Sequence, residues 1–139
     1  MSDYRPVDLT QYPVLLQNYA NYKIVIQGRA RSTVEDYLSD LMLICRVHRK
    51  LREGLPDDPS EISVDPDLSF FESISREDIY NVFSFLTTER GNKAGTRARK
   101  LSALKSFYKY LTVTERMTEH NPVSEIDSPK IPQRLPKYL

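Results

Sequence analysis

The residues most able to do chemistry lie between Lys93 and Leu111. This stretch contains six basic side chains and no acidic one: Lys93, Arg97, Arg99, Lys100, Lys105 and Lys109. At about 100° per residue, one stripe of the predicted helix is apolar. Its members are Leu101, Leu104, Phe107, Tyr108 and Leu111. The opposite side carries Arg99, Ser102, Lys105, Ser106 and Lys109. We expect a helix with one face buried and the other offered to nucleic acid. An ordinary solvated face is the alternative.

The charge of the whole chain is divided unevenly along the sequence. Residues 1–92 carry 10 Lys/Arg and 15 Asp/Glu, a net charge of −5. Residues 93–139 carry 10 and 4, a net charge of +6. A basic third hidden inside a nearly neutral total is the electrostatic pattern of many nucleic-acid binders. A dipolar surface without a partner would give the same charges.

No residue pattern indicates an enzyme active site. His48 falls on an apolar helix face, where we expect a core residue, and His120 falls in a turn. The single cysteine, Cys45, excludes an internal disulfide and a cysteine-based zinc site. We find no glycine-rich phosphate loop and no HExxH motif. The sequence predicts no catalytic residue, no cofactor and no metal. With neither a membrane-spanning run nor a signal-peptide pattern, we expect a cytoplasmic location.

Periodicity predicts four helices and no strand. The first runs from about Pro13 to Gly28, with Leu15, Leu16, Tyr19, Tyr22 and Ile26 as its buried stripe. The second runs from Ser32 to about Arg52 and the third begins at Ser75. The fourth contains the basic stretch, with Thr96 as its N-cap. Ser32 with Glu35, and Ser75 with Asp78, each fit a capping box. An all-α bundle is the expected fold class.

The segments between and beyond the helices differ in composition. Residues 1–9 are expected to be a flexible arm, and residues 10–128 a single helical domain. Residues 54–69 hold three prolines and five acids, which predicts a long acidic surface loop away from any phosphate backbone. Residues 129–139 are basic and proline-rich and predict an extended linker.

Five blocks in this order carry a family resemblance. They are Ser-Thr with Tyr37 at 32–37, SREDI at 75–79, LSALKSFYKYL at 101–111, Asn-Pro at 121–122 and SPKIPQRLPK at 128–137. The chain resembles the N-terminal core-binding, or SAM-like, domain of phage-integrase-type tyrosine recombinases. The resemblance covers about residues 10–139. It implies a compact four-helix domain that forms one half of a clamp around duplex DNA.

The resemblance also implies where the chemistry resides. Members of the family break and rejoin DNA with an Arg, a Lys, a His-x-x-Arg and a nucleophilic Tyr in a separate C-terminal domain. The present sequence has no His-x-x-Arg, and Tyr138 falls in the linker, so we assign it no catalytic role. We therefore expect a DNA-binding part of a DNA integration and recombination enzyme, monomeric alone, whose parent acts with other protomers as a tetramer on DNA.

The resemblance assigns DNA contacts to three groups of residues. The basic helix supplies Thr96, Arg99, Lys100 and Ser102, followed by Lys105, Ser106 and Lys109 toward phosphates. The start of the second helix supplies Arg31, Ser32 and Thr33. The linker supplies Lys130, Arg134 and Lys137 along the backbone. For Ser32, a groove-facing role and a simple N-cap role stay equally open.

Two other functions compete with DNA recombination. A helical protein-interaction module could use the basic helix to bind an acidic partner. An independent transcriptional regulator would require a tight helix-turn-helix pair, which neither helix–helix turn shows clearly.

Overall fold

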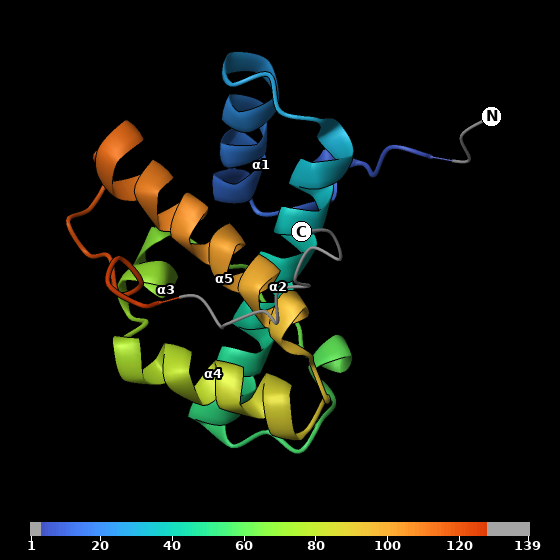
Figure 1. Cartoon of the computed structure of the whole chain (residues 1–139), viewed down its shortest axis with the longest axis vertical. Helices are drawn as coiled ribbons and strands as arrows, with labels where there is room; N and C mark the ends of the chain where they lie inside the picture. The colour runs from blue at the N-terminus through green and yellow to red at the C-terminus, as the bar shows by residue number, and fades with distance from the viewer. Residues whose placement is uncertain (1–3, 128–139) are drawn as a thin grey trace, which may run out of the picture.

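Helix α2 (Arg31–Glu53) is the element on which the others pack in the computed structural model, which describes residues 4–127 (Figure 1). Its 23 residues span about 35 Å. It contacts α1 (Val14–Asn21), α4 (Arg76–Thr88) and α5 (Ala94–Lys109). The remaining elements are η1 (Leu9–Gln11), η2 (Tyr22–Ile26), η3 (Pro59–Glu61), α3 (Leu68–Glu72) and η4 (Tyr110–Thr114). Residues 4–127 contain no strand, which confirms the all-α fold class.

The apolar stripe predicted for the second helix is the buried face of α2. Val34, Leu38, Leu41 and Ile44 are at most 1% exposed, and His48 is buried with them as expected. The helix stops at Gly54, whose φ of +63° lies in the left-handed region that glycine adopts without strain. The amide of Leu55 then closes the end by donating to the Lys50 carbonyl at 3.0 Å.

The acidic segment 54–69 is more ordered than its composition suggests. Asp67 caps helix α3, which the sequence analysis missed, by accepting from the Phe70 amide at 2.9 Å. Lys50 Nζ donates to the carbonyls of Leu55 and Asp57, both at 2.8 Å. Arg49 donates to the Ser63 carbonyl. The cations in the last turns of α2 therefore hold this segment against the domain.

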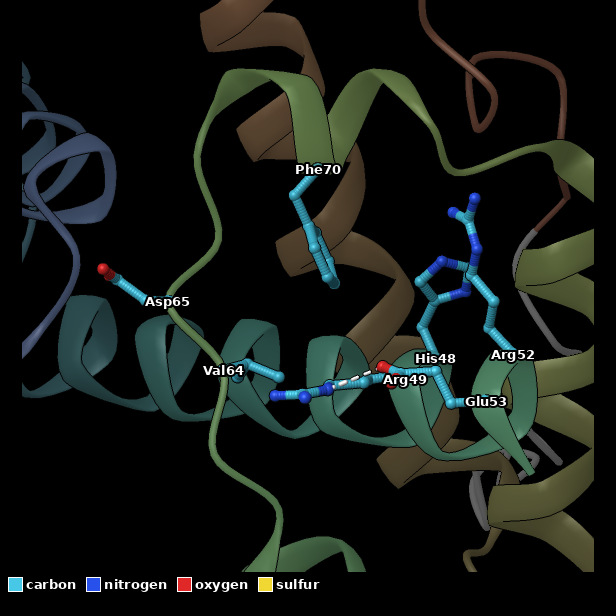
Figure 2. Close-up of a pocket in the computed structure, with 7 residues that line it drawn as sticks. All are labelled: His48, Arg49, Arg52, Glu53, Val64, Asp65 and Phe70. Atoms are coloured by element: carbon cyan, nitrogen blue, oxygen red, sulfur yellow. Dashed lines mark hydrogen bonds and ion pairs between the residues drawn. The ribbon is translucent and has the colours of Figure 1, made fainter. Parts of the chain in front are cut away.

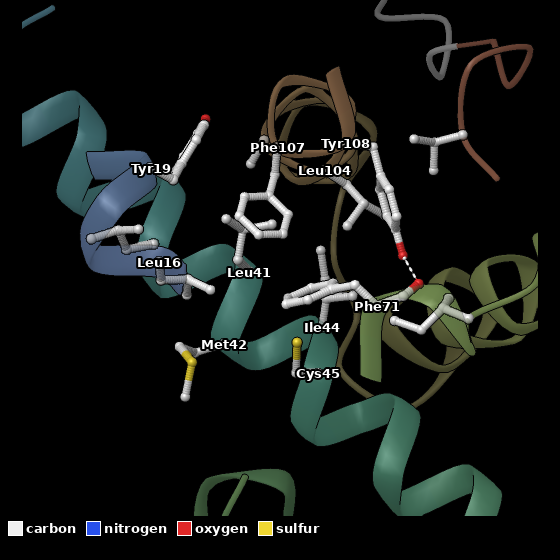
Figure 3. Close-up of a cluster of buried hydrophobic side chains, with 14 of the residues drawn as sticks. Leu16, Tyr19, Leu41, Met42, Ile44, Cys45, Phe71, Leu104, Phe107 and Tyr108 are labelled. Carbon is white, nitrogen blue, oxygen red and sulfur yellow. Dashed lines mark hydrogen bonds between the residues drawn. The ribbon is translucent and has the colours of Figure 1, made fainter. Parts of the chain in front are cut away.

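Aromatic side chains from α1, α3 and α5 meet in the core (Figure 3). The rings of Phe71 in α3 and Phe107 in α5 lie 4.6 Å apart, and Tyr19 in α1 meets Phe107 edge-on at 5.2 Å. The Tyr108 hydroxyl donates to the Phe71 carbonyl at 2.6 Å, the dashed line of Figure 3. Phe71, Phe107 and Tyr108 are fully buried, so the short helix α3 is tied directly to α5.

Helix α1 widens into a π-helical turn, η2, before the chain turns toward α2. The Gln27 amide reaches back five residues to the Tyr22 carbonyl at 3.1 Å, and the Gln27 side chain donates to the Tyr22 hydroxyl. This wider turn rotates Ile26 out of the stripe that an α-helix would give it. Ile26 is 71% exposed, so its predicted burial was wrong.

The N-terminal ends of helices α4 and α5 are capped differently. At α4, Ser75 accepts from the Asp78 amide at 3.0 Å while Asp78 accepts from the Ser75 amide at 2.9 Å, which confirms the predicted capping box. Helix α5 begins three residues earlier than expected, with Lys93 as an N-cap that makes no side-chain cap bond. The prediction that Thr96 caps α5 was wrong, because Thr96 already lies in the first turn.

Replacing Phe71 with Ala should lower the free energy of unfolding by about 3–5 kcal/mol, because the ring is fully buried and its loss leaves a cavity between α3 and α5. Urea denaturation measures the change. Tyr80→Ala removes a comparable ring from a position that is 53% exposed and should cost no more than about 0.5 kcal/mol. Equal costs for the two variants would mean that α3 does not contribute to the core.

Candidate nucleic-acid interface

A cleft of about 260 Å³ opens where η2, the start of α2 and α5 meet. Two predicted contact residues, Thr33 of α2 and Ser106 of α5, line it together. Lys23 and Arg29, which the sequence analysis did not select, line it as well. We call this site, completed by the nearby Lys109, the cationic cleft.

The cations of the cleft repel one another. Burial lowers the pKa of Lys23, and the positive charges of Arg29 and Lys109 lower it further. Lys23 Nζ donates to Gln27 Oε1 at 2.8 Å and lies 5.9 Å from the centre of the Tyr19 ring. Among residues 4–127, none of the three cations forms an ion pair with a carboxylate. Like charges held together without a counter-charge favour binding of an anion.

The N-terminus of α2 adds a second attraction for anions. Its N-cap is Ala30, and no side chain accepts from the amides of the first turn. Ser32 and Thr33 are exposed there, beside the positive end of the helix dipole. The predicted capping box of Ser32 with Glu35 was wrong, because α2 begins one residue ahead of Ser32 and Glu35 is bonded elsewhere. The Ser32 hydroxyl is therefore not used as an N-cap.

Glu35 holds the N-terminal segment instead. Its carboxylate accepts from the Tyr4 hydroxyl, from the Val7 amide at 3.3 Å and from Arg31 Nε at 3.0 Å. Arg31 Nη2 also donates to the Val7 carbonyl at 2.7 Å. Burial alone would raise the pKa of Glu35, but these hydrogen bonds and the Arg31 charge together lower it. Arg31, predicted to contact DNA, is thus engaged in fixing the described part of the expected arm.

A buried carboxylate joins α2 to α5 about two helical turns from the cleft. Asp40 accepts from Arg99 Nε and Nη2, both at 2.9 Å, and from Lys100 Nζ at 2.7 Å. The Lys100 side chain is only 7% exposed. Lys100, which the sequence predicted as a DNA contact, therefore forms an internal ion pair instead. The Arg99 side chain is 52% exposed, and the hydrogen bonds that it donates to Asp40 raise its pKa.

Two contacts between α2 and α5 show the relative direction of these helices. Thr33 meets Ser106 in the cleft, whereas Asp40, further along α2, meets the earlier residue Arg99. Helices α2 and α5 therefore run antiparallel here. The Ser106 hydroxyl is fixed by a 2.7 Å hydrogen bond with Tyr19, whose pKa burial raises to about 12.

The predicted contact residues thus fall into several groups. Thr33 and Ser106 line the cleft and Lys109 lies near it. Ser32, Arg99 and Ser102 are exposed on α2 and α5. Lys105 and Thr96 are half-buried. Lys130, Arg134 and Lys137, with the proposed linker, lie outside the described residues.

Lys23 and Arg29 escaped the sequence analysis because they lie in the acidic part of the chain. They flank Gly28, whose φ of +66° turns the backbone between η2 and α2. The Arg29 amide donates to the Lys23 carbonyl at 2.9 Å, so the turn itself brings the two residues together. In the sequence, the basic residues Lys23 and Arg29 on either side of the helix-ending Gly28 could have indicated this part of the cleft.

A second hollow, of about 330 Å³, lies near the C-terminal end of α2 (Figure 2). His48 meets Phe70 edge-on there at 5.6 Å, and burial lowers the pKa of His48. Arg49 is paired with Glu53 at 2.7 Å, and Asp65 adds another acid to the lining. Arg52, the other arginine of the lining, donates to Ser73 Oγ at 3.3 Å. With two acids beside its two arginines, this hollow suits a polyanion less well than the cationic cleft.

Residues 4–127 lack two further kinds of feature. No described helix has the length and apolar character needed to cross a membrane. In the same range no three His, Cys, Asp or Glu side chains are grouped so that they could hold a metal ion.

Comparison with known proteins shows that the chain is similar to the N-terminal part of tyrosine recombinases. Residues 63–115 match the family described as phage integrase, N-terminal SAM-like domain. The chain is 36% identical over 137 residues to the tyrosine recombinase XerC of Caldanaerobacter subterraneus subsp. tengcongensis, covering 96% of this chain and 38% of that protein. It is 30% identical over 125 residues to the tyrosine recombinase XerD of Haemophilus influenzae, covering 90% and 36%. The chain spans less than two-fifths of either relative. No solved structure matches it.

The Glu35 site predicts a pH-dependent stability. At pH 7, Glu35→Gln should melt a few degrees below the wild-type chain, because glutamine replaces a charged acceptor of three donors. The lowered pKa of Glu35 means that its stabilisation is present above its ordinary pKa of 4.5 and is lost as the pH falls through the folded-state value. Thermal melts between pH 7 and pH 3 should therefore show the difference shrinking below about pH 4.5.

The exposed Glu119 provides the matched control. Glu119→Gln should melt with the wild-type chain at every pH, since its side chain makes no contact comparable with those of Glu35. A difference between wild type and Glu35→Gln that stays constant down to pH 3 would contradict the assigned role of the carboxylate.

Proposed function

Because this chain carries the N-terminal SAM-like domain of the phage-integrase-type tyrosine recombinases, we propose that it binds duplex DNA through the start of α2 and the exposed side of α5. The observation that carries the proposal is the cationic cleft. It combines three crowded cations, an uncapped helix N-terminus and two small hydroxyl side chains within one concave site.

The cleft has the chemistry of a phosphate site. Lys23, Arg29 and Lys109 provide positive charge, and the first amides of α2 provide donors that point along the helix dipole. A bound phosphate would relieve the repulsion that lowers the pKa of Lys23. The hydroxyls of Thr33 and Ser106 are short enough to donate to phosphate oxygens without keeping the backbone at a distance.

Side chains further along α5 extend the interface from the phosphate backbone toward the bases. Ser102 and Arg99 are exposed on the side of α5 that faces away from the core. A helix of this kind fits the major groove, where base edges are read. Neutralisation of about three phosphates by the cleft predicts weak binding, with log K falling with a slope of roughly −3 against log salt.

The whole protein's activity is part of the same proposal. We infer that DNA strand breakage and rejoining occur in a longer recombinase, since this sequence has no His-x-x-Arg and the chain spans 38% of its XerC relative. Assembly with other protomers on DNA, a monomeric state of this chain alone and a cytoplasmic location stay predictions.

The double variant Lys23→Gln/Arg29→Gln tests the cleft. Fluorescence anisotropy of a labelled duplex, titrated at several salt concentrations, should show lower affinity and a salt slope about 2 smaller in magnitude than that of the wild-type chain. Both side chains are at the surface, so the helical circular-dichroism signal should not change.

Arg76→Gln/Arg90→Gln is the control with the same change in charge. These arginines are paired with Glu125 at 3.0 Å and Asp58 at 3.6 Å, beside α4 and away from the cleft. The control should keep the wild-type salt slope. Equal losses in both double variants would show only a general effect of charge. Tighter binding to polyglutamate than to duplex would favour the acidic-partner function instead.

A further inference from the structure

Arg99 is held by one edge and open on the other. Its Nε and Nη2 atoms each donate to one oxygen of Asp40 at 2.9 Å. A guanidinium has five N–H bonds in one plane, so three remain. Two of these, one on Nη1 and one on Nη2, point the same way along the end of the group and can donate together. The Arg99 side chain is 52% exposed.

The buried Asp40 has a second cation. Lys100 Nζ donates to Asp40 Oδ1 at 2.7 Å, and both side chains are at most 7% exposed. This internal pair already balances the buried carboxylate. Arg99 therefore adds a positive charge that the core does not require, and two hydrogen bonds hold that charge in a fixed orientation at the surface.

The surroundings of Arg99 favour an uncharged partner over a phosphate. The carboxylate of Asp36, one turn before Asp40 on α2, also acts on Arg99. Because Lys100 already balances Asp40, Asp36 offsets the charge of Arg99 and leaves little net attraction for a phosphate, whereas a base edge carries no net charge. The phosphate chemistry lies instead at Ser106, seven residues and about 10 Å further along α5. That separation is comparable with the depth of the major groove, about 8.5 Å.

Small residues surround Arg99 on this side of α5. Gly95 lies one turn before Arg99, and Ser102 and Ser106 follow it at helical spacing, before Lys109 at the cleft. A Cβ built on Gly95 would meet nothing within 4 Å. Between Gly95 and Ser106, Arg99 is the long side chain in this row, so this part of the helix can approach a groove closely with one arginine extended from it.

We propose that Asp40 is a positioning residue that orients Arg99 to donate two hydrogen bonds to the O6 and N7 atoms of one guanine. This inference rests on the proposed DNA binding and adds the base that the interface reads. Bidentate contact from arginine distinguishes guanine from the other three bases in the major groove. The cationic cleft supplies affinity, and the Asp40-held arginine supplies sequence preference.

The test begins with selection of preferred sites from a random duplex library by the wild-type chain. Each guanine in a selected site is then replaced, one at a time, by 7-deazaguanine, which lacks the N7 acceptor. At one position we expect wild-type affinity to fall about tenfold. Arg99→Gln should bind the normal and the substituted duplex equally, with a salt slope within about one of wild type.

Two variants test Asp40 itself. Asp40→Asn/Lys100→Met removes the internal ion pair as a unit, which preserves folding better than leaving Lys100 buried alone. Arg99→Lys keeps the charge, needs no change in the core and removes the planar fork. Both should lose most of the 7-deazaguanine penalty while still binding duplex in a salt-dependent way. Circular dichroism confirms that the variants are folded.

The outcomes separate the two proposals. A wild-type chain without salt-dependent duplex binding would overturn the proposed function. Duplex binding with an undiminished 7-deazaguanine penalty in Arg99→Gln would overturn the guanine contact alone. A penalty lost in Arg99→Lys but fully kept in the folded Asp40→Asn/Lys100→Met variant would leave the contact and remove the positioning role of Asp40.

Discussion

The buried carboxylate of Asp40 joins α2 to α5 by accepting hydrogen bonds from Arg99 and Lys100. Removing a carboxylate from water costs several kcal/mol unless a cation is buried with it. Lys100 must therefore meet Asp40, and this contact fixes both the rotation of α5 and its register along α2. In that register Thr33 and Ser106 line the cationic cleft together. Stability and the geometry of the proposed interface depend on the same atoms.

The helices could be predicted from the sequence because their information is local. The stripe from Val34 to His48 and the reciprocal cap at Ser75 depend on residues three or four positions apart, and both are present in the structure. The same local logic failed at Ser32, because Glu35 is bonded by residues of the N-terminal segment. It failed again for α3, whose apolar Phe70 and Phe71 follow a run of prolines and acids. At Ser32 distant partners overruled the local preference, whereas at α3 the local cap of Asp67 was overlooked among the prolines and acids.

The candidate site was predictable as a surface but not as a set of contacts. The alternation of cations and serines along α5 identifies its exposed side. Nothing local shows that Lys100 turns inward to Asp40, 60 positions earlier, while its neighbour Arg99 stays half-exposed. Lys23 and Arg29 join the cleft through the path of the backbone around Gly28. Their charge was counted with the acidic part of the sequence, although in space it belongs with the basic helix.

Because of the π-helical turn after α1, the number of residues in this segment decides where the charge of Lys23 lies. Because this turn closes on Tyr22 with Gln27 instead of Ile26, a polar side chain lies where an α-helix would place an apolar one. Gln27 then holds the ammonium group of Lys23 beside the cleft. Deleting one residue between Tyr22 and Gly28 would return Ile26 to the core stripe and remove this support. At this corner an insertion or deletion would alter the electrostatic surface more than most substitutions. The exposed side chain of Ile26 is apolar surface that the π-helical turn leaves outside the core.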